Sequence, residues 1–404
     1  MIDIFNFHFV CQWFLEEYFQ LDVGPRPSYG YLKENGAHEM SLVIAYCRAG
    51  FERDCAMELS AQLPTDSASG HSPLPGGGAV ALSLSPSARP HEVVRNLSFA
   101  ELVFARQVLV SPGRLGPLPA GDRIPPILES LGGIDGWLGK RVRYGEVFLE
   151  VGDTPESKEL LGFCRKFTPP LMRALEGEGR LCPASQRSPW RLHLFLLSST
   201  ELYPGIALTS NSSPWLMGIP RLKFPAGAPS RSTLKLEEAF LHFLDEKATA
   251  RTLKPGMHAV DLGAAPGGWT YQLVHRQMLV TAVDNGPMDR KLLETGQVEH
   301  RREDGFRFRP RKPVDWMVCD MIEHPERIAR LVGQWIGRGL CRQSIFNLKI
   351  PMKKRYEVVQ RCAELLRAEV HKNATKNRST KITLAFKQLY HDRDEVTGYV
   401  TRPP

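Results

Sequence analysis

The stretch from His258 to Val274, HAVDLGAAPGGWTYQLV, constrains the fold of this chain more than any other. An apolar run ends at Gly263, a turn of small residues follows, and a helical pattern then begins with Trp269 on its apolar face. A strand, a glycine turn and a helix in this order form the crevice at the carboxyl ends of the strands in an open α/β sheet. Glycines let a ligand approach the backbone closely, and the free N–H groups at the helix start suit a polar ligand.

The residues after this turn narrow the choice of ligand. A second apolar run, Met278 to Val283, is closed by Asp284. An acid at the end of the second strand, about 20 residues beyond the first, suits the two hydroxyls of a ribose. The glycine spacing, Gly263-x-x-x-Gly267-Gly268, departs from the G-x-G-x-x-G spacing of dinucleotide sites. The sequence therefore predicts a site for the adenosine of S-adenosylmethionine rather than for NAD, and a glycine turn without a ligand is the alternative.

Length and charge indicate the kind of substrate. The chain has 404 residues, enough for two or three domains, and its net charge of +8 is uneven: residues 211–404 carry +12 and residues 1–210 carry −4. Because the basic half contains the glycine turn, we expect a polyanionic substrate, with a solvated basic face as the alternative. Eight scattered cysteines without a C-x-x-C pair predict free thiols in a reducing cytoplasm and no metal site. No apolar run reaches membrane-spanning length, so we expect no membrane partner.

Composition divides the chain into four regions. Residues 1–39 are rich in aromatic side chains and lack the features of a secretory signal, so we interpret them as an extension ahead of a natural start at Met40. Residues 40–210 have an α+β pattern without a catalytic constellation, and residues 211–230 form a proline-rich linker. Residues 231–404 alternate strand and helix patterns, which predicts an α/β domain with a mostly parallel, doubly wound sheet.

Two local features frame this second domain. A helix is predicted over Thr233 to Leu244, with Ser230 and Ser232 as its N-caps. At the other end of the domain, Lys381 to Tyr390 and Glu395 to Val400 flank a polar turn. They predict an antiparallel hairpin at one edge of the sheet.

Four charged residues of this domain are candidates for catalysis. Asp320 and Lys349 close strands that flank the strand before the glycine turn, so their side chains should meet in one crevice. Lys235 lies near the start of the predicted helix; Glu395, which begins the last strand, is the expected second acid, and His391 is a less favoured substitute. A lysine whose pKa is lowered by burial or by another cation can take the proton of a hydroxyl group. The sequence thus predicts Lys349 as a base, and the alternative for each residue is a solvated side chain.

Other patterns indicate the target of such chemistry. Methylases of base nitrogens usually have an Asn/Asp-Pro-Pro-aromatic turn, and the strand before Asp320 is not followed by one. Neither Cys319 nor Cys341 lies in a Pro-Cys context suited to attack on a pyrimidine ring. A ribose hydroxyl is therefore the expected target. Basic residues with interleaved phenylalanines are typical of looped or single-stranded RNA binding, although they are also found on solvated surfaces and in cores. The residues concerned are Arg301, Arg302, Arg307, Arg309, Arg311, Lys312, Phe306, Phe308, Lys353, Lys354 and Arg355.

Several motifs together resemble the ribosomal RNA large-subunit methyltransferase M family, within the wider FtsJ-like ribose methyltransferases. They are SRSTLKLE (230–237), DLGAAPGGW (261–269), WMVCDM (316–321), NLKIPMKKRY (347–356), MGIPRLKFP (217–225) and QLYHDR (388–393). The resemblance covers nearly all of residues 40–400. It implies a cytoplasmic enzyme, a ferredoxin-like plus THUMP RNA-binding module in the first half and a Rossmann-like class I methyltransferase domain in the second. The implied reaction is 2′-O-methylation of a cytidine in 23S ribosomal RNA or a large-subunit precursor, by a monomer that does not act on DNA.

The resemblance also assigns roles to individual residues. Lys349 would be the proton acceptor of a Lys-Asp-Lys-Glu tetrad whose other members are Lys235, Asp320 and Glu395, while the neighbouring turn also offers Asp392 and Asp394 for the last position. The residues implied to contact S-adenosylmethionine are Ser232, Ala265, Pro266, Gly267, Gly268, Asp284, Asp304 and Asp320.

Two other functions are compatible with parts of the sequence. An RNA-binding ribosome assembly factor with a vestigial cofactor pocket would share the basic half, but the intact turn from Asp261 to Gly268 disfavours it. A small-molecule O-methyltransferase would share the turn, but the basic half and the long first domain disfavour it. Methyl transfer to RNA separates the enzyme from the assembly factor, and salt-sensitive binding to RNA separates it from the small-molecule enzyme.

Overall fold

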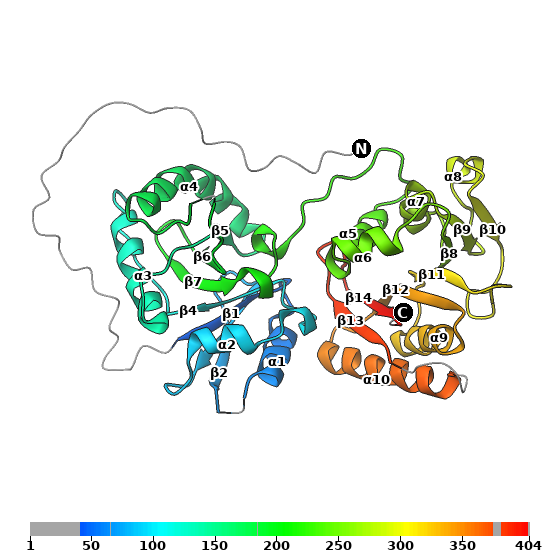
Figure 1. Ribbon diagram of the computed structural model, residues 1–404, viewed down its shortest axis with the longest axis horizontal. Helices are drawn as coiled ribbons and strands as arrows, with labels where there is room; N and C mark the ends of the chain where they lie inside the picture. The colour runs from blue at the N-terminus through cyan, green and yellow to red at the C-terminus, as the bar shows by residue number, and fades with distance from the viewer. Residues whose placement is uncertain (1–40, 65, 184, 375–380, 403–404) are drawn as a thin grey trace, which may run out of the picture.

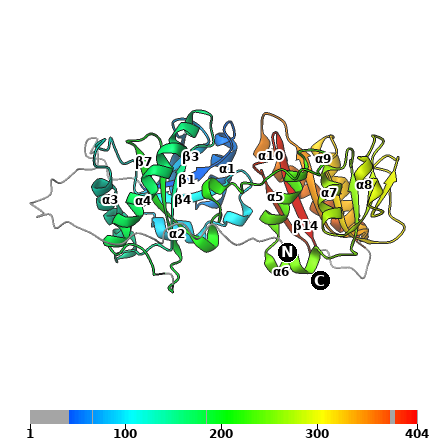
Figure 2. The same cartoon turned by 90° about the horizontal axis from the view of Figure 1, so that it is seen from above.

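The computed structural model describes residues 41–64, 66–183, 185–374 and 381–402. The interpretation of residues 1–39 as an extension falls outside these ranges. The described chain contains two seven-stranded sheets, one in each half, joined by an extended segment that leads from β7 to α5 (Figure 1). Seen from above, the two halves lie end to end (Figure 2).

The first sheet has the strand order β2-β3-β1-β4-β7-β6-β5. Its strands are β1 (Leu42–Tyr46), β2 (Ala68–Pro73), β3 (Ala79–Leu84), β4 (Gln107–Ser111), β5 (Glu146–Val151), β6 (Trp190–Leu196) and β7 (Leu202–Leu208). The helices of this half are α1 (Glu52–Gln62), α2 (Pro90–Asn96), α3 (Ile124–Leu138) and α4 (Leu160–Gly177), with short 3-10 turns η1 (Phe99–Glu101), η2 (Glu156–Glu159), η3 (Thr209–Asn211) and η4 (Leu216–Gly218). Only the β5–β6 pair in this sheet is parallel, so the expected α+β class is confirmed.

Two elements of the first half were not expected from composition. Strand β2 lies in a segment rich in Ser and Gly, a composition typical of loops. The strand forms because it pairs antiparallel with β3 at the sheet edge. Helix α3 begins within residues 111–126, whose many prolines are typical of a linker. Pro125 and Pro126 stand in its first turn, where a helix needs no backbone N–H donor. The prolines therefore start a helix here instead of excluding one.

The second sheet has the strand order β10-β9-β8-β11-β12-β14-β13. Its strands are β8 (His258–Leu262), β9 (Leu279–Val283), β10 (Val298–Arg301), β11 (Val314–Cys319), β12 (Cys341–Lys349), β13 (Thr383–Lys387) and β14 (Glu395–Thr401). The strands from β10 to β12 are parallel, whereas β14 runs antiparallel to both β12 and β13. The expected doubly wound sheet with an antiparallel edge hairpin is confirmed.

Helices cover both faces of this sheet. They are α5 (Thr233–Phe243), α6 (Glu246–Thr252), α7 (Gly268–His275), α8 (Arg290–Glu294), α9 (Pro325–Arg338) and α10 (Arg355–Asn373). Trp316 of β11 packs among the side chains of α5 and α7, and the next residue, Met317, packs in the core that contains Trp335 of α9. Burial of both faces leaves the carboxyl ends of the parallel strands as the open edge. None of the helices in the described ranges has the length and apolar character needed to cross a bilayer.

The two halves are joined by a buried lysine. Lys387, the last residue of β13, donates a hydrogen bond to the carbonyl oxygen of Leu102, and its Nζ lies 4.2 Å from the centre of the Phe99 ring. Burial lowers the pKa of Lys387, while the nearby Glu58 carboxylate, which accepts hydrogen bonds from the backbone of residues 103–105, acts in the opposite direction. The edge hairpin of the second sheet is thereby fixed to the first half.

We predict that Lys387→Ala lowers the free energy of unfolding by about 3 kcal/mol, because it removes the buried hydrogen bond to the Leu102 carbonyl oxygen and the cation over the Phe99 ring. Urea denaturation of the full chain measures this loss. Lys372→Ala, at an exposed position near the end of α10, is the matched control and should unfold like the parent. Equal stability of the two variants would contradict this account of the junction.

Candidate active site

Three of the predicted catalytic residues meet at the carboxyl edge of the second sheet. Asp320 follows the last residue of β11, and Lys349 is the last residue of β12. Glu395 begins β14 and is the direct cross-strand partner of Lys349. The Nζ atom of Lys349 lies 2.7 Å from Glu395 Oε1 and 3.2 Å from Asp320 Oδ1.

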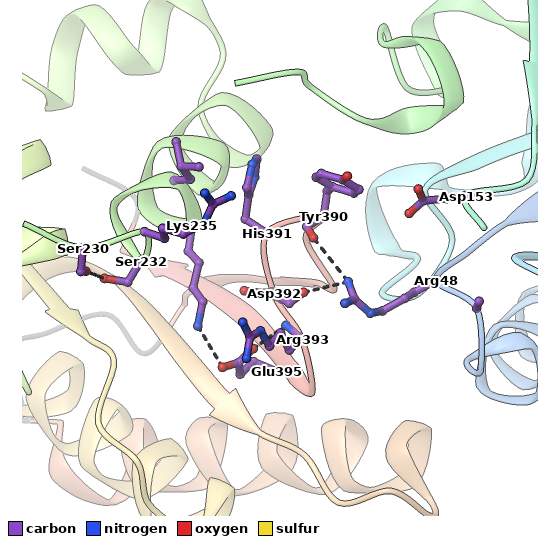
Figure 3. Close-up of a pocket in the computed structure, with 13 residues that line it drawn as sticks. Arg48, Asp153, Ser230, Ser232, Lys235, Tyr390, His391, Asp392, Arg393 and Glu395 are labelled. Atoms are coloured by element: carbon purple, nitrogen blue, oxygen red, sulfur yellow. Dashed lines mark hydrogen bonds and ion pairs between the residues drawn. The ribbon is translucent and has the colours of Figure 1, made fainter. Parts of the chain in front are cut away.

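Lys235 completes this group from the opposite side. It lies in the first turn of α5, and its Nζ atom is 2.9 Å from Glu395 Oε1 and 3.9 Å from Asp320 Oδ2 (Figure 3). Glu395 Oε1 therefore bridges two ammonium groups, while its Oε2 accepts a hydrogen bond from the backbone N–H of Arg393. The four residues singled out in the sequence form one connected network.

The network is mostly buried and electrically balanced. Between 11% and 26% of each side chain is exposed. Burial alone would lower the pKa of Lys349, but the charges and hydrogen bonds of Asp320 and Glu395 raise it above its usual value. Burial alone would raise the pKa of Glu395, but hydrogen bonds from Lys349, the Arg393 backbone and Lys235 lower it to about 2. The expectation of a lowered pKa at Lys349 is wrong for this arrangement, because the effect of the two carboxylates outweighs that of burial.

We predict that Glu395→Gln lowers the pKa of Lys349, because the variant removes a carboxylate in direct contact with the ammonium group. Nuclear magnetic resonance of lysines labelled at Cε follows this titration, with Lys349→Arg to assign the signal. Glu364→Gln, at an exposed position on α10, is the control and should leave the titration unchanged. A Lys349 signal that titrates alike in all proteins would contradict the assignment of charges.

The turn before β14 contains other candidates for the second acid of the expected Lys-Asp-Lys-Glu tetrad. The Nδ1 atom of His391 lies 2.6 Å from Glu238 Oε2, so this ring is held by α5. The carboxyl group of Asp392 contacts the backbone N–H of Leu389 and the hydroxyl of Thr397 instead of a lysine. Of these candidates, Glu395 is the one with short contacts to both lysines.

A cavity of about 440 Å³ adjoins the network on the side of the parallel strands. Among its lining residues are Gly263, Ala265, Asp284, Asp304 and Asp320. The Asp284 carboxylate is fixed by the backbone N–H groups of Ala265 and Gly286, at 3.0 and 2.7 Å. Of the residues expected to contact the cofactor, Ala265 and the three aspartates thus share one cavity.

The wall of this cavity leaves no room for larger side chains. Gly263 has a φ of +79°, and a Cβ atom there would lie 2.8 Å from the side chain of Met321. A Cβ atom on Gly305 would meet the sulfur of the same methionine at 2.8 Å. Ile322, 91% exposed, adds an apolar surface at the rim. The carboxylates of this cavity can accept hydrogen bonds from the hydroxyl and amino groups of an adenosine, and the apolar surface can pack against its flat base.

The other expected cofactor residues lie outside the lining of this cavity. Gly267, with a φ of +116°, and Gly268 start α7, and the carbonyl oxygen of Pro266 accepts a hydrogen bond from Asp289. Ser232 does not cap α5 as expected, because its own backbone is already helical; its hydroxyl instead lies 2.7 Å from that of Ser230. Contact of these residues with a cofactor stays a prediction.

A larger cleft, of about 720 Å³, lies on the other side of the network, between the two halves (Figure 3). Lys235 and Glu395 line its inner end, and Arg48 and Asp153 of the first half line the opposite wall. Arg48 donates hydrogen bonds to the carbonyl oxygens of Tyr390 and Asp392, at 3.4 and 2.8 Å, and so holds the turn that precedes β14. Arg231, Arg393 and the side chain of Tyr390 complete a basic and aromatic surface.

The basic cluster expected to bind RNA is divided in the structure. Phe308 stacks against Trp335 in the core, with ring centres 6.4 Å apart, whereas Phe306 lines the smaller cavity beneath the guanidinium of Arg327. Arg355 is committed to the junction between the halves, because it donates to the Gly50 carbonyl and the Asp54 carboxylate and lies over the ring of Phe51. A role in RNA binding stays a prediction for the exposed members of the cluster.

Sequence reasoning missed two polar residues beside the network. Asn347 precedes Lys349 by two positions in β12, and its amide donates a 2.8 Å hydrogen bond to Asp320. Its side chain lies on the same face of the strand, so the period of two was a usable signal. Arg48 follows β1 in a part of the chain without catalytic motifs, and only the packing of the two halves brings it to the cleft.

Comparison with known proteins agrees with this geometry. Residues 40–109 match the RlmM ferredoxin-like domain, residues 122–208 the N-terminal model of ribosomal RNA large subunit methyltransferase M, and residues 228–375 the FtsJ-like methyltransferases. A protein of Methylococcus capsulatus named ribosomal RNA large subunit methyltransferase M is 49% identical over 362 residues, which cover 89% of this chain and 98% of the relative. The chain belongs to this family.

Other members of the ribosomal RNA large subunit methyltransferase M family are similar over the same length. The Cellvibrio japonicus protein of that name is 45% identical over 89% of this chain and 99% of its own. The Proteus mirabilis protein is 47% identical over 89% of this chain and 96% of its own length. Both sheets of this chain, the ferredoxin-like first half and the FtsJ-like second half, therefore fall within the family.

Proposed function

We propose that this chain transfers a methyl group from S-adenosylmethionine to the ribose 2′-hydroxyl of a cytidine in 23S ribosomal RNA. The observation that carries the proposal is the network of Lys235, Asp320, Lys349 and Glu395, which lies between a cavity suited to adenosine and a basic cleft. The names of the relatives support large-subunit ribosomal RNA as the substrate.

The smaller cavity is the proposed cofactor site. Asp284 and Asp304 would accept hydrogen bonds from the ribose and the base, and Ile322 would pack against the adenine ring. S-adenosylmethionine would supply a methyl group made electrophilic by its sulfonium sulfur. The position of Asp320, which lines the cavity and contacts Lys349, would bring that group next to the network.

Lys349 is the proposed acceptor of the hydroxyl proton. Since Asp320 and Glu395 raise its pKa, the ammonium group would first have to release its own proton to solvent before it could accept the proton of the hydroxyl. Asp320 and Glu395 hold the two lysines on either side of the place where the hydroxyl would bind. Most of the rate would then come from positioning, with proton transfer as the second contribution.

The basic cleft is the proposed path of the RNA strand. Arg48, Arg231 and Arg393 would bind phosphates of the strand. The cleft ends at Lys235 and Glu395, so a nucleotide inserted from it would reach the network with its ribose. The first half, residues 40–210, would hold the RNA while residues 231–404 carry out the chemistry, with residues 211–230 as the linker.

The first test is transfer of labelled methyl groups from S-adenosylmethionine to unmodified 23S RNA. We expect the label in a dinucleotide that resists nuclease and alkali, and a loss of about 10²- to 10⁴-fold in Lys349→Ala, which removes the proton acceptor. Binding of the cofactor to the variant, measured by calorimetry, should be retained. Label on a base would overturn the role of the network, and no label despite tight RNA binding would indicate an assembly factor.

The second test concerns the cleft. Arg231→Ala should weaken RNA binding and reduce the slope of log affinity against log salt by about one, because one phosphate contact is lost. Arg290→Ala removes an arginine that is 91% exposed on α8 and pairs with Glu294, and it should leave both quantities unchanged. Filter binding at several salt concentrations measures the effect, and identical slopes for the two variants would contradict the proposed path.

A further inference from the structure

A chain of buried polar side chains continues from Asp320 across β12 and β14 to the turn that precedes β14. Asn347 of β12 and Thr397 of β14 are direct cross-strand partners, and both are fully buried. Thr397 Oγ1 lies 2.8 Å from Asn347 Oδ1 and 3.0 Å from Asp392 Oδ2. The Asn347 amide in turn lies 2.8 Å from Asp320 Oδ1. The chain therefore links a carboxylate of the network to Asp392, a buried acid outside it.

The available donors fix the direction of these hydrogen bonds. Asp320 is an acceptor, so Asn347 must turn its NH₂ group toward Asp320 and its carbonyl oxygen toward Thr397. The Thr397 hydroxyl has a single proton for two neighbouring oxygens. The Asn347 carbonyl oxygen can only accept, whereas a carboxyl group can carry a proton of its own, so we assign the hydroxyl proton to the shorter contact with Asn347. Thr397 Oγ1 can then only accept from Asp392, and this needs a proton on the Asp392 carboxyl group.

The surroundings of Asp392 favour the same proton. The residue is 1% exposed, and in the described part of the chain its Oδ1 atom has no hydrogen-bond partner. The backbone N–H of Leu389 donates to Oδ2. Burial raises the pKa of Asp392, and among the charged groups around it Lys235 lowers the pKa while Glu395 and Glu238 raise it. The Arg48 guanidinium is bound to the carbonyl oxygen of the same residue.

We propose that Asp392 is a neutral carboxylic acid that donates to Thr397, and that the chain Asp392–Thr397–Asn347 positions Asp320. Asp320 Oδ1 is the acceptor shared by the Asn347 amide and the Lys349 ammonium group, so the amide keeps this oxygen facing Lys349. Asn347, Thr397 and Asp392 are thus positioning residues that act through Asp320. Their effect on methyl transfer rests on the proposed function, whereas the protonation of Asp392 does not.

The protonation state is tested on the full chain by carboxyl carbon resonance of labelled aspartates, with Asp392→Asn to assign the signal. An ordinary aspartate titrates near a pH of about 4. We expect the Asp392 signal to stay at the position of a protonated acid through neutral pH. A signal at the position of an ionised carboxylate at neutral pH would overturn the neutral acid. This measurement decides without any enzymatic activity.

The positioning role is tested by a matched pair at one site. Thr397→Val removes the hydroxyl with little change in shape, and Thr397→Ser retains it. In the valine variant the Asn347 carbonyl oxygen loses its donor, so the amide that contacts Asp320 is less firmly oriented. The Lys349 titration should then move to lower pH, and kcat should fall about tenfold to a hundredfold with little change in KM. The serine variant should resemble the parent in all three.

Equal behaviour of the valine and serine variants would overturn the positioning role. Lysine resonance reads the Lys349 titration even if the parent protein transfers no methyl group to ribose, so failure of this inference and failure of the proposed function are distinguishable. If the valine variant does not fold, the carboxyl resonance of the parent still decides whether Asp392 carries the proton.

Discussion

The antiparallel pairing of β14 with β12 is the constraint on which the site depends. It places Glu395 directly opposite Lys349 and Thr397 directly opposite Asn347, so one register sets the ion pair and the buried hydrogen bond together. A shift of one residue would turn these side chains to the opposite face of the sheet. In a sheet that is otherwise parallel from β10 to β12, this strand brings a carboxylate back to the carboxyl edge, where the two lysines need a counter-charge.

The same hairpin also connects the two halves, together with the contacts of Arg355. Lys387 at the end of β13 is buried against η1, and the turn that follows is held by Arg48 through two carbonyl oxygens. Glu395 begins β14 immediately after this turn, so the first half supports the segment that carries one carboxylate of the network. One turn of the chain thus lines the proposed RNA cleft and also leads into the network.

Charge balance explains why the four charged groups remain stable although they are mostly buried. Two ammonium groups and two carboxylates compensate each other, and Glu395 bridges both lysines through one oxygen. The same two carboxylates raise the pKa of Lys349 and so favour its protonated form. A base in such a site becomes active when its surroundings change, which is a property of the complete complex with substrate and cofactor rather than of the lysine alone.

The sequence by itself determined the glycine turn, the alternation of strands and helices, the edge hairpin and the four residues of the network. These follow from local periodicity and from the rule that parallel strands end at one edge. Tertiary structure decided the rest. Strand β2 and the stacking of Phe308 on Trp335 depend on partners distant in sequence, as does the approach of Arg48 to Asp392. The sequence also could not predict the raised pKa of Lys349. It depends on the short distances from Lys349 Nζ to the Asp320 and Glu395 carboxylates, and only the packing of the strands sets these distances.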